Sequence, residues 1–313
     1  EDTETGSSPF VVATGGSVAT VGDYKIHTFT GPGTFCVSSA GSALGYNKLD
    51  YLVVAGGGGG GGNISHIQGG GGGGAGGFRE SQNPAIAPAW TASPLVSATS
   101  LCAAVGAISV AVGAGGNGGG ASPSPTLNPA PGANGTNGGV STFSTITSAG
   151  GGRGSQPTSN PTPGTGSGAA EAGGSGGGES GGNPGSGFGA GDTPPTSPPQ
   201  GKTGGSGDTT NYTLGGGGGG ATAVGTNASG PCTGGGFGGA GATTSINASP
   251  VTYSTGGNSA RPVPCGAAGN AADNTGKGGP ANNYYPSPSG PSIPKYDGFN
   301  GGSGIVIIRY KFQ

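Results

Sequence analysis

The residues that could carry catalysis are few and widely spaced. Only two histidines occur, His27 and His66, and there is no histidine-rich cluster. Gly201-Lys202-Thr203 resembles the end of a phosphate-binding loop, but Thr196 stands where that loop requires its first glycine. GxGxxG patterns recur throughout so glycine-rich a chain and carry no information. The sequence therefore predicts no enzyme, no metal site and no cofactor.

The remaining ionisable side chains are also scattered. His27 falls in an apolar segment, where we expect a structural role, whereas His66 lies between glycine blocks and is expected to face solvent. The acids Glu171, Glu179 and Asp192 are isolated from one another, and we expect them to contribute solubility.

Cysteine spacing argues against a thiolate metal site. None of the cysteines belongs to a CxxC pair, and all lie far apart: Cys36, Cys102, Cys232 and Cys265. One or two disulfides among them, in any of the three pairings, would suit an extracellular protein. Free cysteines acting as small core residues are the alternative.

Aromatic side chains outside the expected strands are the candidates for recognition, because they supply rigid contact area and stack on sugar rings. We assign these residues to a receptor-binding site: Trp90, Tyr212, Tyr284 and Tyr285. The alternative is that they pack as covers over the glycine-rich region. For the phenylalanines that follow or interrupt glycine runs we expect core packing instead: Phe78, Phe143, Phe188 and Phe237.

Three uninterrupted glycine runs dominate the chain, at 56–62, 69–74 and 215–220. Ordering glycine costs roughly 1–2 kcal/mol of backbone entropy per residue, and glycine brings no apolar side chain to offset that cost. The compensation must come from many backbone hydrogen bonds between close neighbours. Polyproline-II-type helices allow this, because they make no internal hydrogen bonds and turn once every three residues. We therefore predict a sandwich of left-handed threefold polyglycine II helices.

Composition sets the alternatives. Glycine and proline together make 82 + 26 = 108 of 313 residues, which by itself is typical of disorder or low complexity. Collagen is excluded because glycine occurs in blocks rather than at every third position. The net charge of −2 offers no basic surface for nucleic acid. The sequence contains no stretch of 18 apolar residues, which membrane insertion would require.

Strand-like segments flank the glycine-rich region. Segments 10–13, 24–29, 34–37 and 49–55 predict an N-terminal β-region over residues 1–55, and 107–112 and 143–147 are further strand candidates. We expect 304–313 to form a C-terminal strand that pairs with 49–55 and clamps the glycine-rich lattice over 56–303. Proline-bearing inserts, such as the pre-extended 192–202, are expected to be connections at the lattice ends. The fold class predicted is all-β or irregular, with essentially no α-helix.

The order of non-glycine motifs along the chain carries a resemblance. Tyr24 to Phe35, Asp50 to Gly60, Gly76-Gly77-Phe78-Arg79, Ser148 to Gly152, Pro194 to Gly201 and Gly301 to Tyr310 are similar to the glycine-rich C-terminal domain of bacteriophage tail-fibre and adhesin proteins. The resemblance covers nearly the whole chain from about residue 20. It implies a non-enzymatic fibre-tip domain that binds a host cell-surface protein or glycan through variable loops on a polyglycine II scaffold.

The resemblance also implies a virion or otherwise extracellular location and other fibre subunits as partners, with a homo-oligomer as an open alternative. Broken glycine blocks such as 256–260 depart from the pattern and put the regularity of the later helices in doubt. Two other functions are therefore kept. One is a structural subunit that polymerises into an extracellular fibre or matrix, and the other is an ice-binding glycine-rich protein.

Overall fold

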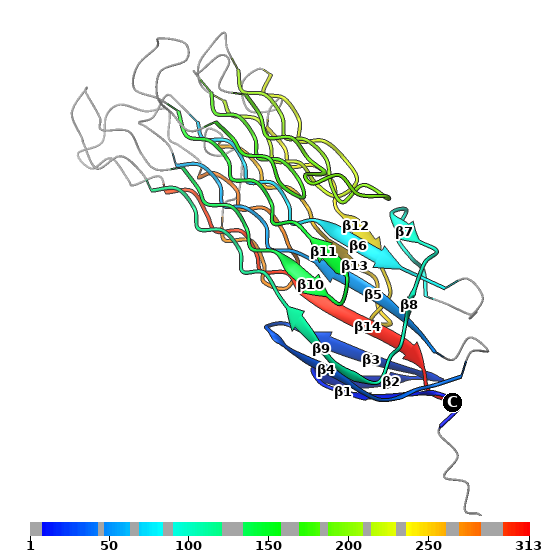
Figure 1. Cartoon of the computed structure of the whole chain (residues 1–313). Coiled ribbons are helices and arrows are strands. Elements are labelled where there is room, and N and C mark those ends of the chain that lie inside the picture. Colours follow the sequence, from blue (N-terminus) through cyan, green and yellow to red (C-terminus); the bar gives the residue numbers. More distant parts are fainter. Residues whose placement is uncertain are drawn as a thin grey trace, which may run out of the picture.

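The molecule is elongated, with β-sheets at one end and glycine-rich segments running away from them (Figure 1). The computed structural model describes residues 8–42, 47–62, 69–83, 90–120, 134–157, 169–181, 187–208, 214–229, 236–260, 269–282 and 297–313. The described residues contain strands and no helix, so the predicted all-β fold is confirmed.

The strands follow the chain in this order: β1 Val11–Thr14, β2 Ser17–Val21, β3 Tyr24–Phe29, β4 Gly33–Ala40, β5 Lys48–Val54, β6 Phe78–Ser81, β7 Val96–Ser97, β8 Leu101–Cys102, β9 Gly106–Ala111, β10 Ser141–Phe143, β11 Ile146–Ser148, β12 Ala242–Thr244, β13 Val251–Tyr253 and β14 Ile305–Lys311. The predicted strand at 143–147 is instead the β10–β11 hairpin, because Ser144 takes a positive φ of 54° and turns the chain. Segment 56–303 also contributes β6 to β13, so the glycine-rich region is not one continuous block.

The C-terminal strand lies at the centre of the larger sheet. Its order is β2-β3-β14-β5-β6-β7, with β8 also paired to β5. β14 pairs antiparallel with β3 and with β5, Ile307 standing opposite Leu52, which confirms the predicted pairing of the chain ends. Strands β5 and β14 are apolar almost throughout because both faces of this sheet are covered.

Two apolar clusters cover those faces. One lies between this sheet and the five-stranded sheet β1-β4-β9-β10-β11, and it contains Phe35, Phe143 and Tyr310. The other lies on the opposite face, where the β12–β13 hairpin supplies Tyr253 against Ile307. Alternate residues of β14 therefore point into different clusters, as the period of a strand requires.

Glycine-rich segments, which we call rods, extend from the strands or from short turns beside them. The rods are 55–62, 69–77, 112–120, 134–140, 149–157, 169–172, 174–181, 187–191, 201–208, 214–221, 223–229, 236–241, 254–260, 269–272, 276–282 and 297–304. They run side by side along the length of the molecule (Figure 1). Consecutive rods along the chain run away from the sheets and then back.

The hydrogen bonds of rod 55–62 rotate around its axis with a period of three residues. The amides of Gly56 and Gly59 donate to rod 134–140, those of Gly57 and Gly60 to rod 297–304, and those of Gly58 and Gly61 to rod 69–77. Its carbonyls accept from three further rods, 112–120, 149–157 and 276–282. Each residue thus bonds a different neighbour, and six rods surround this one in a hexagonal arrangement.

The same arrangement surrounds rods 69–77 and 214–221, and together they define three layers. The middle layer is 112–120, 55–62, 69–77, 214–221 and 223–229. One outer layer is 134–140, 149–157, 174–181 and 201–208, and the other is 297–304, 276–282, 254–260 and 236–241. Rods 169–172 and 187–191 lie on the first outer layer, and rod 269–272 lies on the second.

The uninterrupted glycine runs are the interior rods of the middle layer. A Cβ added to Gly59 would lie 1.9 Å from the carbonyl oxygen of Asn117, and one added to Gly218 would lie 1.9 Å from that of Gly73. Marginal rod 112–120 instead carries exposed side chains three residues apart, Ala114 and Asn117. Broken glycine blocks therefore mark the margin of the lattice. The period-three pattern supports the polyglycine II assignment, which stays a prediction.

The proline-rich segment 192–200 differs from the extended connection that the sequence predicts. Asp192 Oδ1 accepts hydrogen bonds from the amides of Thr196 and Gln200, both at 3.0 Å, and folds the segment into a compact turn. Gln200 Nε2 donates to the carbonyl of Pro194 at 2.7 Å, while its Oε1 accepts from the amide of Ala149 at 2.8 Å. The turn thereby attaches to the start of rod 149–157 on the sheet side.

Candidate functional site

The rod ends remote from the sheets form the candidate site. At this end the described chain stops and resumes between 62 and 69, 120 and 134, 157 and 169, 181 and 187, 208 and 214, 229 and 236, 260 and 269, and 282 and 297. Strand β1 and the C-terminus both lie at the opposite, sheet end (Figure 1). The scaffold thus brings segments from all along the sequence to one end of the molecule.

Backbone and side-chain contacts hold these ends together. The amide of Gly181 donates to the carbonyl of Gly69 at 2.9 Å, and the amide of Asp208 donates to that of Leu214 at 2.9 Å. Glu179 is only 6% exposed, and its two carboxylate oxygens accept from the amides of Gly187 at 3.0 Å and Gly207 at 3.2 Å.

The isolated acids therefore do more than contribute solubility, contrary to the sequence-based expectation. Glu179 bridges three rods, and Asp192 shapes a turn, because each finds backbone amides that no rod carbonyl satisfies. Glu171 forms an ion pair with Arg153, with 2.8 Å between Oε1 and Nη2.

The residues predicted for receptor binding are not brought together in the part of the chain that is described. Tyr212, Tyr284 and Tyr285 lie outside the described residues, although each belongs by sequence to a stretch that joins two remote rod ends. Trp90 lies instead at the sheet end, half-buried beside β6. Its position favours the packing role over the recognition role.

Trp90 packs in a polar cluster on the larger sheet. The guanidinium of Arg309 lies over the rings of Tyr24 and Trp90, at 4.6 and 4.8 Å from their centroids. Trp90 Nε1 donates to Glu80 at 3.3 Å, and Glu80 also accepts from the amide of Ser93 at 2.9 Å. No sequence signal pointed to this cluster, because its residues come from separate parts of the chain.

The predicted structural role of His27 is confirmed. Its side chain is fully buried, with Nδ1 2.7 Å from the carbonyl oxygen of Gly15 and Nε2 3.0 Å from the hydroxyl of Tyr310. Burial lowers the pKa of His27 and so favours the neutral imidazole in the folded protein. His66 lies outside the described residues.

The phenylalanine expectations are met in half of the cases. Phe78 and Phe143 are buried in the two apolar clusters. Phe188 and Phe237 are 49% and 44% exposed, contrary to the expected core packing. They occupy outward positions of marginal rods, where no layer of the described chain covers them.

The cysteines that can be placed are unpaired. Cys36 and Cys102 are both free and exposed, so neither forms one of the disulfides left open by the sequence. Cys36 lies on β4 of the smaller sheet and Cys102 on β8 beside β5, which keeps them on separate sheets. Cys232 and Cys265 lie outside the described residues. Among the described side chains there is no cluster of metal-ligating residues.

A polar cleft of about 490 Å³ opens along the margin of the lattice near the sheets. Rods 112–120, 269–272 and 297–304 form most of its walls. Its polar side chains are those of Thr30, Asn270, Asp273, Asn274, Asn300 and Ser303. The cleft lies away from the remote rod ends. Within the described part of the chain, no helix has the length and apolarity to cross a membrane.

Asp50 gives the sheet end a measurable pH dependence. Burial raises its pKa to about 6, although the amide of Asn83, the hydroxyl of Ser100 and the charge of Arg309 act in the opposite direction. Between pH about 4 and about 6 the folded state therefore holds a proton that the unfolded chain has released. We expect the free energy of unfolding to fall by about 3 kcal/mol as the pH rises through this window.

Asp50→Asn should remove that dependence, which urea unfolding of both proteins between pH 4 and 7 would measure. His27 works in the opposite direction, because its lowered pKa makes stability fall as the pH falls. The difference between the two proteins isolates Asp50. Parallel stability curves for wild type and variant would contradict the assignment.

Comparison with known proteins gives one informative result. The chain matches no curated protein. Residues 28–311 match the model of a family described as a glycine-rich domain. This match includes the end of β3, all the rods and β14, so it covers the lattice and the strand β14 that clamps it. The chain therefore belongs to the glycine-rich domain family.

Proposed function

We propose that the chain is a non-enzymatic receptor-binding domain at the tip of a virion fibre, where it contacts a host cell-surface protein or glycan. The observation that supports this most directly is the position of the rod ends. They gather many separate sequence segments at one end of a rigid scaffold, opposite β1 and the C-terminus. Loops displayed on a rigid scaffold are the usual site of recognition. The motif order shared with tail-fibre domains agrees with this.

The composition of the joining segments fits recognition. Segment 283–296 contains Tyr284 and Tyr285 among asparagine, serine and proline, and segment 209–213 contains Tyr212 among threonine and asparagine. Tyrosine with small polar residues is the composition of many binding loops, because tyrosine offers large contact area at low entropic cost.

The proposal predicts that Tyr212→Ser/Tyr284→Ser/Tyr285→Ser weakens cell binding at least about tenfold, since aromatic anchors dominate most interfaces. Flow cytometry of the fluorescently labelled chain on a panel of bacterial strains would measure this. Val18→Ser/Val105→Ser is the matched control, because both valines are more than half exposed at the sheet end, at 51% and 68%. Equal binding by the tyrosine variant and the wild type would exclude these segments as the receptor site.

A polymerising fibre or matrix subunit is the second candidate. β1 and β2 are edge strands of their sheets, and exposed edges can pair with another chain. Negative-stain images would separate the two proposals, since a polymerising subunit forms long repeats of this chain alone. The exposed positions of the described marginal rods carry mostly asparagine, alanine, valine and phenylalanine, with threonine at separate positions such as Thr136 and Thr226 rather than in an array, so nothing there favours ice binding.

A further inference from the structure

The marginal rods present a row of amides that point away from the lattice. In rod 149–157, the amides of Gly151 and Gly154 donate to rod 55–62, and those of Gly152 and Ser155 donate to rod 174–181. The next positions in this rotation are 153 and 156. Their amides point to the place that one more rod would occupy, where no rod of the described chain lies.

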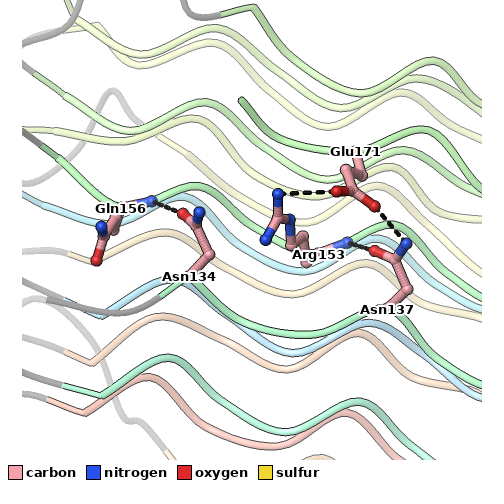
Figure 2. A network of polar contacts seen from close by, with 5 residues as sticks. All are labelled: Asn134, Asn137, Arg153, Gln156 and Glu171. Atoms are coloured by element: carbon pink, nitrogen blue, oxygen red, sulfur yellow. Dashed lines mark hydrogen bonds and ion pairs between the residues drawn. The ribbon is translucent and has the colours of Figure 1, made fainter. Parts of the chain in front are cut away.

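Asparagine side chains occupy these amides. Asn137 Oδ1 accepts from the amide of Arg153 at 2.8 Å, and Asn134 Oδ1 accepts from that of Gln156 at 3.0 Å (Figure 2). Donors and acceptors are each three residues apart, so the pairs repeat with the period of the rods. We call a side chain in this position a cap.

Caps occur at the other margins too. In each case the cap comes from a rod beside a lattice position that no described rod occupies. The caps are Asn227 on the amide of Ser206 at 2.9 Å, Asn258 on Gly238 at 2.9 Å, Asn300 on Gly118 at 2.8 Å, Asn270 on Asn300 at 3.1 Å, Thr136 on Asn117 at 2.8 Å and Thr226 on Phe237 at 2.7 Å. Side-chain caps therefore recur at several margins of the lattice.

The chemistry of the cap explains the choice of asparagine. Its carboxamide oxygen is equivalent to a peptide carbonyl, so it replaces the acceptor that a further rod would provide. The cap beside Arg153 is itself held in place, because Asn137 Nδ2 donates to Glu171, whose carboxylate is paired with Arg153 Nη2 at 2.8 Å (Figure 2). Because the cap is fixed, the amide of Arg153 keeps its hydrogen bond although no further rod lies beside it in the described chain.

We propose that these caps close the lattice against lateral addition of rods from a second copy of this chain. Without caps, these amides would recur every three residues along a rod. That spacing matches the carbonyls of the rods already in the lattice, and a second copy of the chain supplies rods of the same kind. Sheet edges pose the same hazard and are protected in analogous ways. The cleft of about 490 Å³ beside rods 112–120, 269–272 and 297–304 is another open margin, and Asn270, Asn300 and Asp273 line it.

The test is Asn134→Ala/Asn137→Ala, which uncaps one margin. We expect a concentration-dependent rise in mass above the wild type in size-exclusion chromatography with light scattering. We also expect a lysine-flanked hexaglycine peptide to bind the double variant at least about tenfold more tightly than it binds the wild type. A few new backbone hydrogen bonds provide a gain of this size. Asn117→Ala is the control, because it removes an exposed carboxamide of the same lattice that caps no described amide.

A folded double variant with wild-type mass and wild-type peptide binding would overturn the proposal. Circular dichroism and denaturant unfolding establish whether the variant folds. If it does not, Asn227→Ala/Asn258→Ala uncaps two other margins and is read in the same way. Unfolding of both double variants would also overturn the proposal, because the caps would then hold the rods together rather than close their margin.

Discussion

Gly218→Ala is expected to destabilise the protein by more than about 4 kcal/mol, which exceeds the usual effect of a single substitution. The new Cβ would lie 1.9 Å from the carbonyl oxygen of Gly73, and both groups belong to interior rods with neighbours on every side. No flexible side chain can move to make room. Rods 214–221 and 69–77 would have to separate, and their lateral hydrogen bonds would be lost together.

The measurement is chemical unfolding followed by circular dichroism, with Gly269→Ala as the matched control. No atom lies within 4 Å of a Cβ built on Gly269, and its φ is outside the left-handed region. The control should change the free energy of unfolding by less than about 1 kcal/mol and can stabilise by restricting the unfolded chain. Similar effects of the two substitutions would show that the lattice tolerates side chains in its interior.

Phe35→Ala is expected to cost about 3–5 kcal/mol, the range for truncating a buried phenylalanine. The ring is fully buried between the two sheets, with centroids 5.1 Å from that of His27, 5.8 Å from that of Phe143 and 6.2 Å from that of Tyr310. Those neighbours come from β3, β10 and β14, so the resulting cavity would loosen both sheets and the strand pairing that joins the chain ends. Thermal and denaturant unfolding would measure the loss.

Phe188→Ala makes the same chemical change at a position that is 49% exposed on a marginal rod. It should cost less than about 1 kcal/mol, as surface substitutions usually do. If the two phenylalanine variants lost equal stability, the interior between the sheets would not be the main apolar core.

Several parts of the fold follow directly from residue types. Apolar runs at 49–55 and 304–312 identify the paired central strands, because their hydrophobicity requires cover on both faces. Uninterrupted glycine at 56–62 identifies an interior rod, since no side chain fits there. The short strands β2 and β12 escape detection, because their few, mostly polar or small residues resemble the loops around them.

The neighbours of each rod could not be predicted from the sequence. Rods recognise one another through peptide groups, which are the same in every residue, so no side-chain complementarity shows that 56–62 lies beside 297–304. The caps leave a faint signal. Asn134 and Asn137 recur at the period of a threefold rod, and such spacing on a broken glycine block marks a margin.

The candidate site was predictable only in outline. Polar, proline-bearing inserts indicate where the chain reverses, but not that so many reversals share one end of the molecule. Trp90 shows the limit of composition-based assignment. It lies near prolines, as a loop residue would. Glu80 on β6 and Arg309 on β14 nevertheless hold it against the sheet.

The parallel alignment of rods between the remote ends and the sheets determines how the molecule would respond to mechanical tension. A force applied at the remote ends and resisted at the sheets would act along every rod axis at once. The lateral hydrogen bonds would then be loaded in shear, all together, rather than opened one after another. A domain of this geometry would resist pulling far better than its modest apolar content indicates, and the direction of the applied force would decide how well.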